Sequence, residues 1–193
     1  MPIRVVIAED EAIIRLDLKE TLEEEGYEVV GETGRGDEAV ALVRELKPDL
    51  AILDVRMPGM DGLTAAREIT ADHLAAVLVL TAYSQRNLIE EARDAGALAY
   101  VVKPFQRSEL IPAIEVALGR HREMRALADE NASLEEQLAT RRLTDRAKGM
   151  LMDNHGMRES DAWSFIQKTA MNQRVKIQLV AQQIIDGELT PPE

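Results

Sequence analysis

Five residues that could together bind a metal ion and a phosphoryl group follow short apolar runs in the first half of the chain. They are Glu9, Asp10, Asp54, Thr81 and Lys103. Clustered carboxylates repel one another unless a cation neutralises them, and Mg²⁺ prefers oxygen ligands of this kind. A lysine ammonium and a threonine hydroxyl can hold phosphoryl oxygens, and a carboxylate can act as a nucleophile towards phosphorus.

Whether these residues meet depends on the apolar runs that precede them. Three of the runs are nearly continuous in Val, Ile and Leu, which is typical of strands covered on both faces of a parallel sheet. Amphipathic stretches separate the runs, and this alternation predicts a doubly wound α/β domain of five parallel strands, with ligands bound beyond the carboxyl ends of the strands. The runs cover residues 3–8, 27–32, 49–54, 76–81 and 97–102.

Each of these residues also has an ordinary structural interpretation. An acid after a strand often caps a helix, a threonine there often packs, and a lysine is often solvated. A rival function comes from G-R-G-D-E-A at 34–39, which fits the dinucleotide-binding pattern G-x-G-x-x-A. That segment follows the second apolar run rather than the first, so we expect its glycines only to form a strand-to-helix turn.

The composition narrows the class of protein. The chain has 193 residues, of which 46% are hydrophobic, enough for one domain or two small ones. The lack of cysteine excludes disulfides and cysteine nucleophiles, and three scattered histidines argue against a zinc enzyme. Acids occur by residue 9, and the longest apolar stretch, around 74–82, is half a membrane span. We expect a soluble, cytoplasmic protein without a membrane segment.

No strand pattern returns after Ser108, which we expect to cap a helix. Four apolar residues are spaced as in a short heptad pattern with Asn131 at an a position. This pattern fits a single linker helix or a parallel dimer in which the two asparagines pair, and a buried asparagine favours the dimer. The four apolar residues are Met124, Leu127, Leu134 and Leu138.

A local excess of positive charge marks residues 141–178. Residues 1–120 hold 23 acidic and 13 basic residues, net −10, whereas 141–178 hold four acidic and eight basic residues, net +4. A basic surface can hold phosphates even on an acidic chain. The small residues Ala147 and Gly149 flank Lys148, so an RNA backbone could approach the helix there. Trp163 could stack on a base, but its apolar neighbours favour a place in the core.

Four segments of the first half carry a resemblance to a known family. They are A-E-D-E (8–11), I-L-D-V-R-M-P-G-M-D-G (52–62), L-T-A (80–82) and Y-V-V-K-P-F (100–105). In combination they resemble the receiver domain of two-component response regulators, which has a five-stranded flavodoxin-like fold.

The resemblance implies roles for the acidic residues. Asp54 would accept the phosphoryl group from a sensor histidine kinase. Asp10, Asp54 and the backbone carbonyl of Arg56 would ligate Mg²⁺, and Glu9, where many receivers have aspartate, would assist through water. The protein would be a phosphoryl acceptor with at most slow self-dephosphorylation, and not an enzyme.

The resemblance also implies a switch. Lys103 would pair with the phosphoryl oxygens, and Thr81 would turn inward to hydrogen-bond them. Tyr100 matches the aromatic residue that moves inward as Thr81 vacates its place, and the Lys103–Pro104 bond is cis in that family. Arg56 and Tyr83 stand at positions that tune the lifetime of the phosphoryl group.

The second half resembles a different module. The segments are L-T-D-R-A-K-G-M-L-M (143–152), D-A-W-S-F-I-Q-K-T-A-M (161–171) and V-A-Q-Q-I-I (180–185). They are similar to the ANTAR domain, a three-helix RNA-binding module of transcription antiterminators. The resemblance implies binding of RNA hairpins in nascent transcripts, near RNA polymerase. Arg158 departs from the Ser or Thr expected to cap the second helix. The candidate RNA-binding residues are Arg142, Arg146, Lys148, Arg174 and Lys176.

We therefore predict a receiver domain at 1–119, a helical, coiled-coil linker at 120–140, a three-helix domain at 141–187 and a flexible tail at 188–193. Phosphorylation of Asp54 would favour a homodimer and promote RNA binding and transcription antitermination. Two alternatives are a phosphorylation-switched DNA-binding activator and a receiver with a protein-interacting helical tail.

Overall fold

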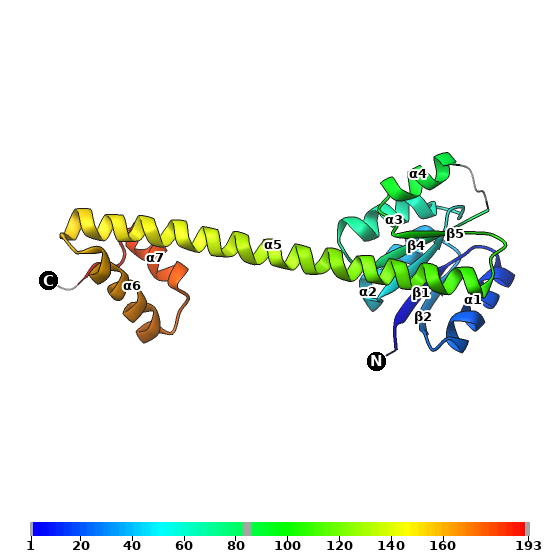
Figure 1. Cartoon of the computed structure of the whole chain (residues 1–193), viewed down its shortest axis with the longest axis horizontal. Helices are drawn as coiled ribbons and strands as arrows, with labels where there is room; N and C mark the ends of the chain where they lie inside the picture. The colour runs from blue at the N-terminus through cyan, green and yellow to red at the C-terminus, as the bar shows by residue number, and fades with distance from the viewer. Residues whose placement is uncertain (1, 83–85, 192–193) are drawn as a thin grey trace. The chain divides into compact units, whose positions relative to one another are not determined.

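The computed structural model describes residues 2–82 and 86–191, with the backbone alone at 86–88 (Figure 1). The chain divides into two compact units, Met1–Ala126 and Leu127–Glu193, which we call the N-terminal and C-terminal units. Within the described ranges, no helix combines the length and apolar composition needed to cross a bilayer.

The N-terminal unit contains the predicted five-stranded parallel sheet, in the order β2-β1-β3-β4-β5. Every residue of β3 and β4 is buried, which explains why these strands are almost continuously apolar in sequence. The strands are β1 (Arg4–Ala8), β2 (Glu28–Thr33), β3 (Leu50–Asp54), β4 (Ala76–Thr81) and β5 (Ala99–Val102).

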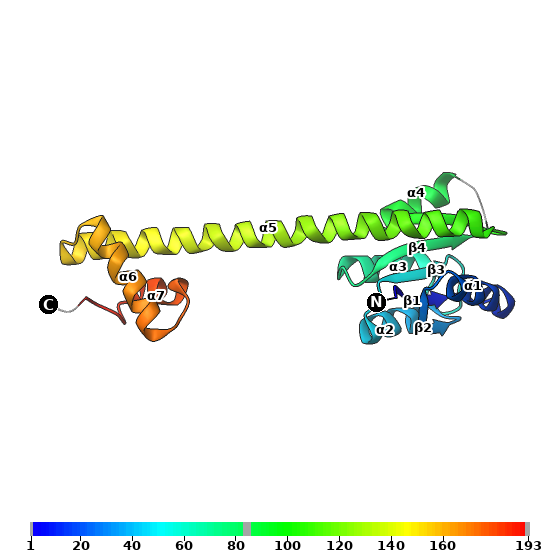
Figure 2. The same ribbon diagram turned by 60° about the horizontal axis from the view of Figure 1, so that its bottom comes forward.

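Helices cover both faces of the sheet, as Figures 1 and 2 show. The helices are α1 (Ala12–Glu24), α2 (Gly36–Leu46), α3 (Gly62–Ala71), α4 (Arg86–Asp94) and the first part of α5 (Arg107–His155). Buried residues of α1 and α5 pack on one face, and those of α2, α3 and α4 pack on the other. This is the doubly wound arrangement that the alternating sequence pattern predicts.

The C-terminal unit is all helical, with α6 (Glu159–Gln173) and α7 (Ile177–Ile185) packed against the end of α5 (Figure 2). The predicted linker and the first predicted helix of this unit belong to one continuous helix, because α5 runs unbroken to His155. Gly156, in the left-handed region with φ 65°, follows the end of this helix. The core of the unit consists of Ala147, Leu151, Ala162, Ile166, Ala170, Val180, Ala181 and Ile184.

The starts of α5 and α6 and the C-terminal tail can be compared with the predictions made for them from the sequence. The prediction that Ser108 caps α5 is wrong, because the helix begins at Arg107, and Glu109 accepts a hydrogen bond from the backbone N–H of Gln106. Arg158 stands at the N-cap of α6 without a side-chain capping bond, as its sequence departure indicates. Leu189, placed in the predicted tail, packs against the C-terminal core.

Candidate functional sites

Strand order brings the predicted acidic residues to one edge of the sheet. β1 and β3 are neighbours, and the chain leaves them in opposite directions, with β2 on one side and β4 on the other. Such a switch point opens a crevice beyond the carboxyl ends of the strands. Glu9 and Asp10 follow β1 directly, Asp54 and Thr81 end β3 and β4, and Lys103 follows β5.

Lys103 lies between two of the carboxylates. Its Nζ is 2.6 Å from Oε2 of Glu9 and 3.0 Å from Oδ1 of Asp54. Glu9, Asp54 and Thr81 are buried, whereas Asp10 is exposed at the mouth of the pocket. The backbone N–H of Lys103 donates to the carbonyl of Thr81 at 2.8 Å, which ties the start of the β5 loop to the end of β4.

The acidic cluster fits a hard divalent cation. Carboxylate oxygens of Glu9, Asp10 and Asp54 all lie within 4.8 Å of one another. When the three carboxylates are ionised, the ammonium of Lys103 offsets only one of their charges. The remaining negative charge and the all-oxygen donor set are those that Mg²⁺ prefers.

Burial shifts the protonation equilibria of this pocket. It raises the pKa of Asp54, against the hydrogen bond and charge of Lys103, and the nearby charge of Asp10 adds to the rise. It also raises the pKa of Glu9, again opposed by Lys103. Burial alone would lower the pKa of Lys103, but its contacts with Glu9 and Asp54 raise it overall. The cationic form of Lys103 is therefore the stable one.

The pocket has room for a small group beside Asp54. It has a volume of about 340 Å³, and Asp10, Asp54, Arg56, Thr81 and Lys103 are among its lining residues. The backbone N–H of Arg56 interacts with the Asp54 carboxylate. The structure therefore brings together the five residues that the strand ends predict, and Arg56, which the resemblance assigns to this site, also lines the pocket.

Two glycines allow the helices to begin close to the strand ends. A Cβ at Gly62 would overlap the carbonyl of Asp54, and a Cβ at Gly36 would overlap the carbonyl of Met60. Gly36 thus serves close packing of α2 on the loop after β3, which gives the G-R-G-D-E-A segment a structural role. The Lys103–Pro104 peptide bond is cis, as the resemblance implies.

Tyr100 lies on the surface rather than in the acidic pocket. Its side chain is 44% exposed and lines a shallow groove between α4, β5 and α5 with Ile89, Pro112 and Val116. Tyr83, which the resemblance assigns to the lifetime of the phosphoryl group, lies outside the described residues.

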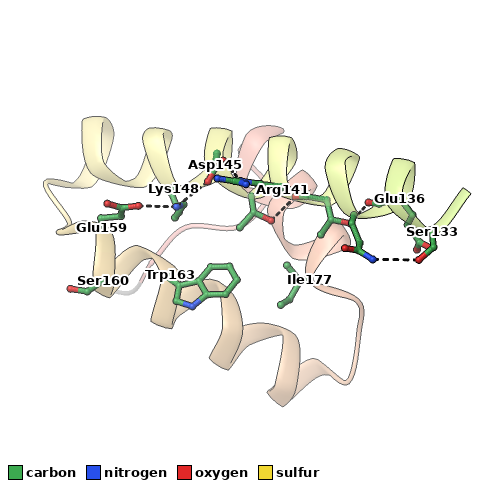
Figure 3. Close-up of a pocket in the computed structure, with 12 residues that line it drawn as sticks. Ser133, Glu136, Arg141, Asp145, Lys148, Glu159, Ser160, Trp163 and Ile177 are labelled. Atoms are coloured by element: carbon green, nitrogen blue, oxygen red, sulfur yellow. Dashed lines mark hydrogen bonds and ion pairs between the residues drawn. The ribbon is translucent and has the colours of Figure 1, made fainter. Parts of the chain in front are cut away.

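A larger groove of about 870 Å³ lies in the C-terminal unit, between α5, α6 and α7 (Figure 3). Trp163 of α6 and Ile177 of α7 face polar residues of α5 across it, among them Glu136, Arg141 and Asp145. The favoured interpretation of Trp163 as a core residue is wrong. Its neighbours Ala162 and Ile166 supply the core, while the indole is 37% exposed at the groove.

The lysines among the candidate RNA-binding residues are paired with acids of the same unit. Lys148 lies 3.0 Å from Asp145 and 2.9 Å from Glu159, and contact with Glu159 and then Asp145 raises its pKa. Lys176 lies 3.2 Å from Glu136. Arg142, Arg146 and Arg174 are exposed and form no ion pair with any residue that the structure describes. The predicted basic surface is therefore weaker at its lysines than the charge count indicates.

The small residues around Lys148 have a different role from the one expected. Ala147 is fully buried in the three-helix core, so the proposed close approach of an RNA backbone over it is excluded. No atom would meet a Cβ at Gly149, which leaves that side of Lys148 open. Glu136 and Glu159 could not be predicted as partners from the sequence, because neither is close to its lysine along the chain. Asp145 could have been, since it lies three residues before Lys148 on one helix.

The heptad residues of α5 form an exposed stripe. Met124, Leu127, Leu134 and Leu138 are each about half exposed or more, and Asn131 is exposed among them. None of the described residues of the same chain covers this stripe. The dimer interpretation requires a buried Asn131, and only a second helix packed on the stripe would bury it.

Comparison with known families matches both halves of the chain. Residues 5–115 match the response regulator receiver domain, and residues 132–185 match the ANTAR domain. The second match begins within the segment predicted as a linker, in agreement with the contribution of Ser133 and Glu136 to the C-terminal groove.

Relatives cover either the whole chain or its first half. The transcriptional regulatory protein PdtaR of Mycobacterium tuberculosis (strain ATCC 25618 / H37Rv) is 55% identical over 193 residues, which are 100% of this chain and 94% of PdtaR. The chemotaxis protein CheY of Thermotoga maritima is 43% identical over 112 residues, 58% of this chain and 93% of CheY.

Solved structures resemble the first half. The receiver domain of the response regulator NarL from Mycobacterium tuberculosis superposes with a TM-score of 0.59 at 30% identity, covering 61% of this chain and 97% of that domain. CheY in a CheX–CheY–BeF₃–Mg²⁺ complex from Borrelia burgdorferi superposes with a TM-score of 0.57 at 26% identity, covering 59% of this chain and 87% of that CheY.

Proposed function

Because this chain belongs to the response-regulator family and joins a receiver domain to an ANTAR domain, we propose that it is a phosphorylation-switched, RNA-binding regulator of transcription antitermination. It acts in the cytoplasm, receives a phosphoryl group from a sensor histidine kinase, and has no catalytic activity beyond slow loss of that group. The observation that carries the proposal is the presence, in one chain, of the Asp54–Lys103 pocket and a module of the ANTAR type.

In the proposed transfer, a carboxylate oxygen of Asp54 attacks the phosphorus of a phosphohistidine. An O–P bond forms, the N–P bond breaks, and the histidine nitrogen keeps the electron pair. Lys103, 3.0 Å from Oδ1 of Asp54, offers its charge to the phosphoryl oxygens.

Asp10, Asp54 and the carbonyl of Arg56, with Glu9 acting through water, would hold Mg²⁺ in this pocket. Bound there, the ion would neutralise charge on the phosphoryl oxygens. The proposal is supported by the cluster of carboxylate oxygens within 4.8 Å and by the similarity to a CheY solved with BeF₃ and Mg²⁺.

Thr81 and Tyr100 connect the pocket to the surface. Thr81 is buried at the end of β4 and lines the pocket, so its hydroxyl is placed to hydrogen-bond a phosphoryl oxygen on Asp54. The exposed ring of Tyr100 would then move towards the place that Thr81 vacates. This movement would change the groove between α4 and α5, which Tyr100 lines.

The RNA site is proposed on the C-terminal unit, where Trp163 and Lys148 line the groove and three further arginines are exposed. Arg142, Arg146 and Arg174 have no ion-pair partner among the described residues and can contact phosphates directly, whereas Lys148 and Lys176 must first leave their acidic partners. The half-exposed indole of Trp163 offers a face on which an unstacked base could lie.

The exposed stripe of α5 supports a dimer as the active form. A second helix packed in parallel would cover Leu127, Leu134 and Leu138 and pair the two Asn131 side chains. A stripe this short forms a marginal coiled coil, whose population a few kcal/mol from phosphorylation is enough to shift.

The proposal is tested with the full-length protein, a two-hairpin RNA and a gel shift. Treatment with acetyl phosphate and Mg²⁺ should tighten RNA binding about tenfold or more, and Asp54→Asn should remove this response. Equal affinity for duplex DNA of the same length would favour a DNA-binding activator instead. No binding of either nucleic acid at low salt would favour a protein-interacting tail.

A further inference from the structure

A second pocket of the N-terminal unit lies at the edge of the sheet opposite the acidic pocket. It has a volume of about 380 Å³, within the range of small-molecule sites. The residues that line it come just before three strands, namely Ile3 before β1, Asp49 before β3 and Leu74 before β4, and from the part of α5 around His121. It is therefore formed by four segments that are distant in sequence.

Positively charged groups dominate this pocket, although residues 1–120 carry a net charge of −10. Five groups that carry or can acquire a positive charge face one acid, Asp49, whose Oδ2 already accepts the backbone N–H of Arg4 at 2.8 Å. The five groups are Lys47, His73, His121, Arg122 and Arg125.

The lysine and arginines of this pocket differ from most other such residues of the unit, because they have no ion-pair partner among the residues that the structure describes. Lys47, Arg122 and Arg125 form no ion pair with any described residue, and Arg122 donates only to the carbonyl of Leu118, at 3.3 Å. Elsewhere in the unit, Lys19 pairs with Glu32 at 3.0 Å and Arg44 with Glu68 at 3.4 Å. A concentration of unpaired cations in an acidic domain leaves a local positive potential that a bound anion would relieve.

Two of these side chains stand where a helix more often ends in glycine. Lys47 follows α2 with φ 47°, and His73 lies just beyond α3 with φ 50°, both in the left-handed region. At these positions a cation offsets the negative end of its own helix, which by itself explains one such residue. Both side chains also line the same pocket, which brings two such cations to one place.

The positive charges of the pocket affect the pKa of His121. Burial lowers the pKa of His121, and the charges of Arg125 and His73 lower it further, while Asp49 opposes them. The imidazole of His121 is thus close enough to these groups to respond to a neutralising anion.

We propose that this pocket binds a small organic phosphate, with the phosphate oxygens held by Arg122, Arg125 and Lys47. The remaining wall is apolar, formed by Ile3, Pro48, Leu74 and Leu118, and suits a ring or ribose attached to the phosphate. A small ligand fits better than a nucleic acid, because a long polyanion would extend beyond the pocket over a unit in which residues 1–120 carry a net charge of −10. This site is independent of the RNA-binding function proposed above.

The three histidines of the chain make a direct test possible, since His73 and His121 line the pocket and His155 lies at the end of α5 in the C-terminal unit. Full-length protein with ¹³C-labelled histidines is titrated with pyrophosphate and with ADP at physiological ionic strength, with EDTA to exclude metal effects. We expect saturable shifts of the His73 and His121 imidazole signals, an unmoved His155 signal, and ADP affinity at least fivefold above that of pyrophosphate.

Variants separate specific binding from general attraction. Arg122→Ala combined with Arg125→Ala should weaken ADP binding tenfold or more. Arg120→Ala removes one positive charge from the same helix, but Arg120 lines a different groove and donates to the carbonyl of Leu98, so its effect should stay within twofold, whereas Arg122→Ala or Arg125→Ala alone should each exceed it.

Three results would overturn the proposal. One is the absence of saturable shifts of the His73 and His121 signals up to 10 mM ADP, a concentration well above the Kd expected of a specific site. Another is an equal loss of affinity in Arg120→Ala and in the double variant, which would show unspecific attraction. The third is a single-stranded RNA oligonucleotide that shifts His73 and His121 at lower concentration than ADP, which would assign the pocket to nucleic acid.

Discussion

The ammonium of Lys103 lies closer to Glu9, at 2.6 Å, than to the proposed acceptor Asp54, at 3.0 Å. Glu9 is fully buried, so its carboxylate is stabilised by Lys103 and by the backbone N–H of Glu11, which donates to Oε1 at 3.2 Å. Glu9 therefore positions Lys103 at the base of the pocket, in addition to the water-mediated contact with Mg²⁺ that the resemblance to receiver domains implies.

This relationship predicts the behaviour of Glu9→Gln. The amide can still accept a hydrogen bond from Lys103 but carries no charge, so the pocket attracts a divalent cation less strongly. Mg²⁺ affinity measured by calorimetry should fall about tenfold, equivalent to ~1.4 kcal/mol. Asp17→Asn removes the same charge from an exposed position on α1 that does not line the pocket, and should change the affinity much less. Equal effects of the two variants would show that Glu9 acts only through its net charge.

Asp54 should be the residue that is phosphorylated. Incubation with acetyl phosphate and Mg²⁺ should add one phosphoryl group, seen by intact-mass spectrometry, and Asp54→Asn should abolish the addition. Asp61→Asn is the matched control, because Asp61 caps α3 through Thr64 at 2.8 Å and asparagine caps a helix equally well. Full labelling of Asp54→Asn, or labelling in the presence of EDTA, would contradict the assignment.

The raised pKa values of Glu9 and Asp54 predict how stability depends on pH. A carboxyl whose pKa is raised on folding contributes stability at pH values below its ordinary pKa, and this contribution is lost as the pH rises through the raised value. At neutral pH and without metal, Asp54→Asn should therefore stabilise the N-terminal unit, and the gain should vanish below the ordinary carboxyl range.

Mg²⁺ should produce the same stabilisation in the wild type, about 1.4 kcal/mol at ten times its Kd. Hydrogen exchange of the β3 and β4 amides measures this unit separately from the other. If the stabilities of the wild type and of Asp54→Asn change in parallel with pH, ionisation of Asp54 does not destabilise the folded unit.

The ion pairs of Lys148 predict that an acidic residue restrains RNA binding. Glu159→Gln should free Lys148 in part, since Asp145 remains at 3.0 Å, and raise RNA affinity about two- to fivefold, as expected for exposed pairs. Asp161→Asn is the matched control in the same first turn of α6. Lys148→Ala should weaken binding and lower the salt slope by about one. If Glu159→Gln binds RNA no better than Asp161→Asn, the ion pair does not oppose RNA.

The exposed stripe of α5 predicts dimerisation on activation. Leu127→Ala with Leu134→Ala should abolish the dimer that beryllofluoride, a phosphoryl mimic, induces at tens of micromolar in sedimentation, because both leucines occupy d positions. Met152→Ala removes an exposed apolar residue of the same helix outside the stripe and should leave the dimer intact. Monomers at this concentration with and without beryllofluoride would show that the helix is only a linker.

The parallel sheet and the acidic pocket can be predicted from the amino-acid sequence. Buried strands are apolar throughout, and residues that end successive parallel strands must share one edge of the sheet. The positions of Asp10, Asp54, Thr81 and Lys103 could therefore be predicted from the strand ends alone. The exposed stripe of α5 can also be predicted from the sequence, because the spacing of apolar residues along one helix is a local property.

Which charged side chains lack an ion-pair partner, and which aromatic side chains are exposed, depends on the tertiary structure. Whether Lys148 is paired depends on Glu159 of another helix, and whether Trp163 is buried depends on how α6 packs against α5. The basic pocket arises in the same way, since Lys47, His73 and Arg125 are distant in sequence and meet only where three strands begin beside α5. Periodicity identifies the apolar face of a helix or strand. Ion pairs and pockets depend instead on the distances between side chains of different elements, which periodicity does not give.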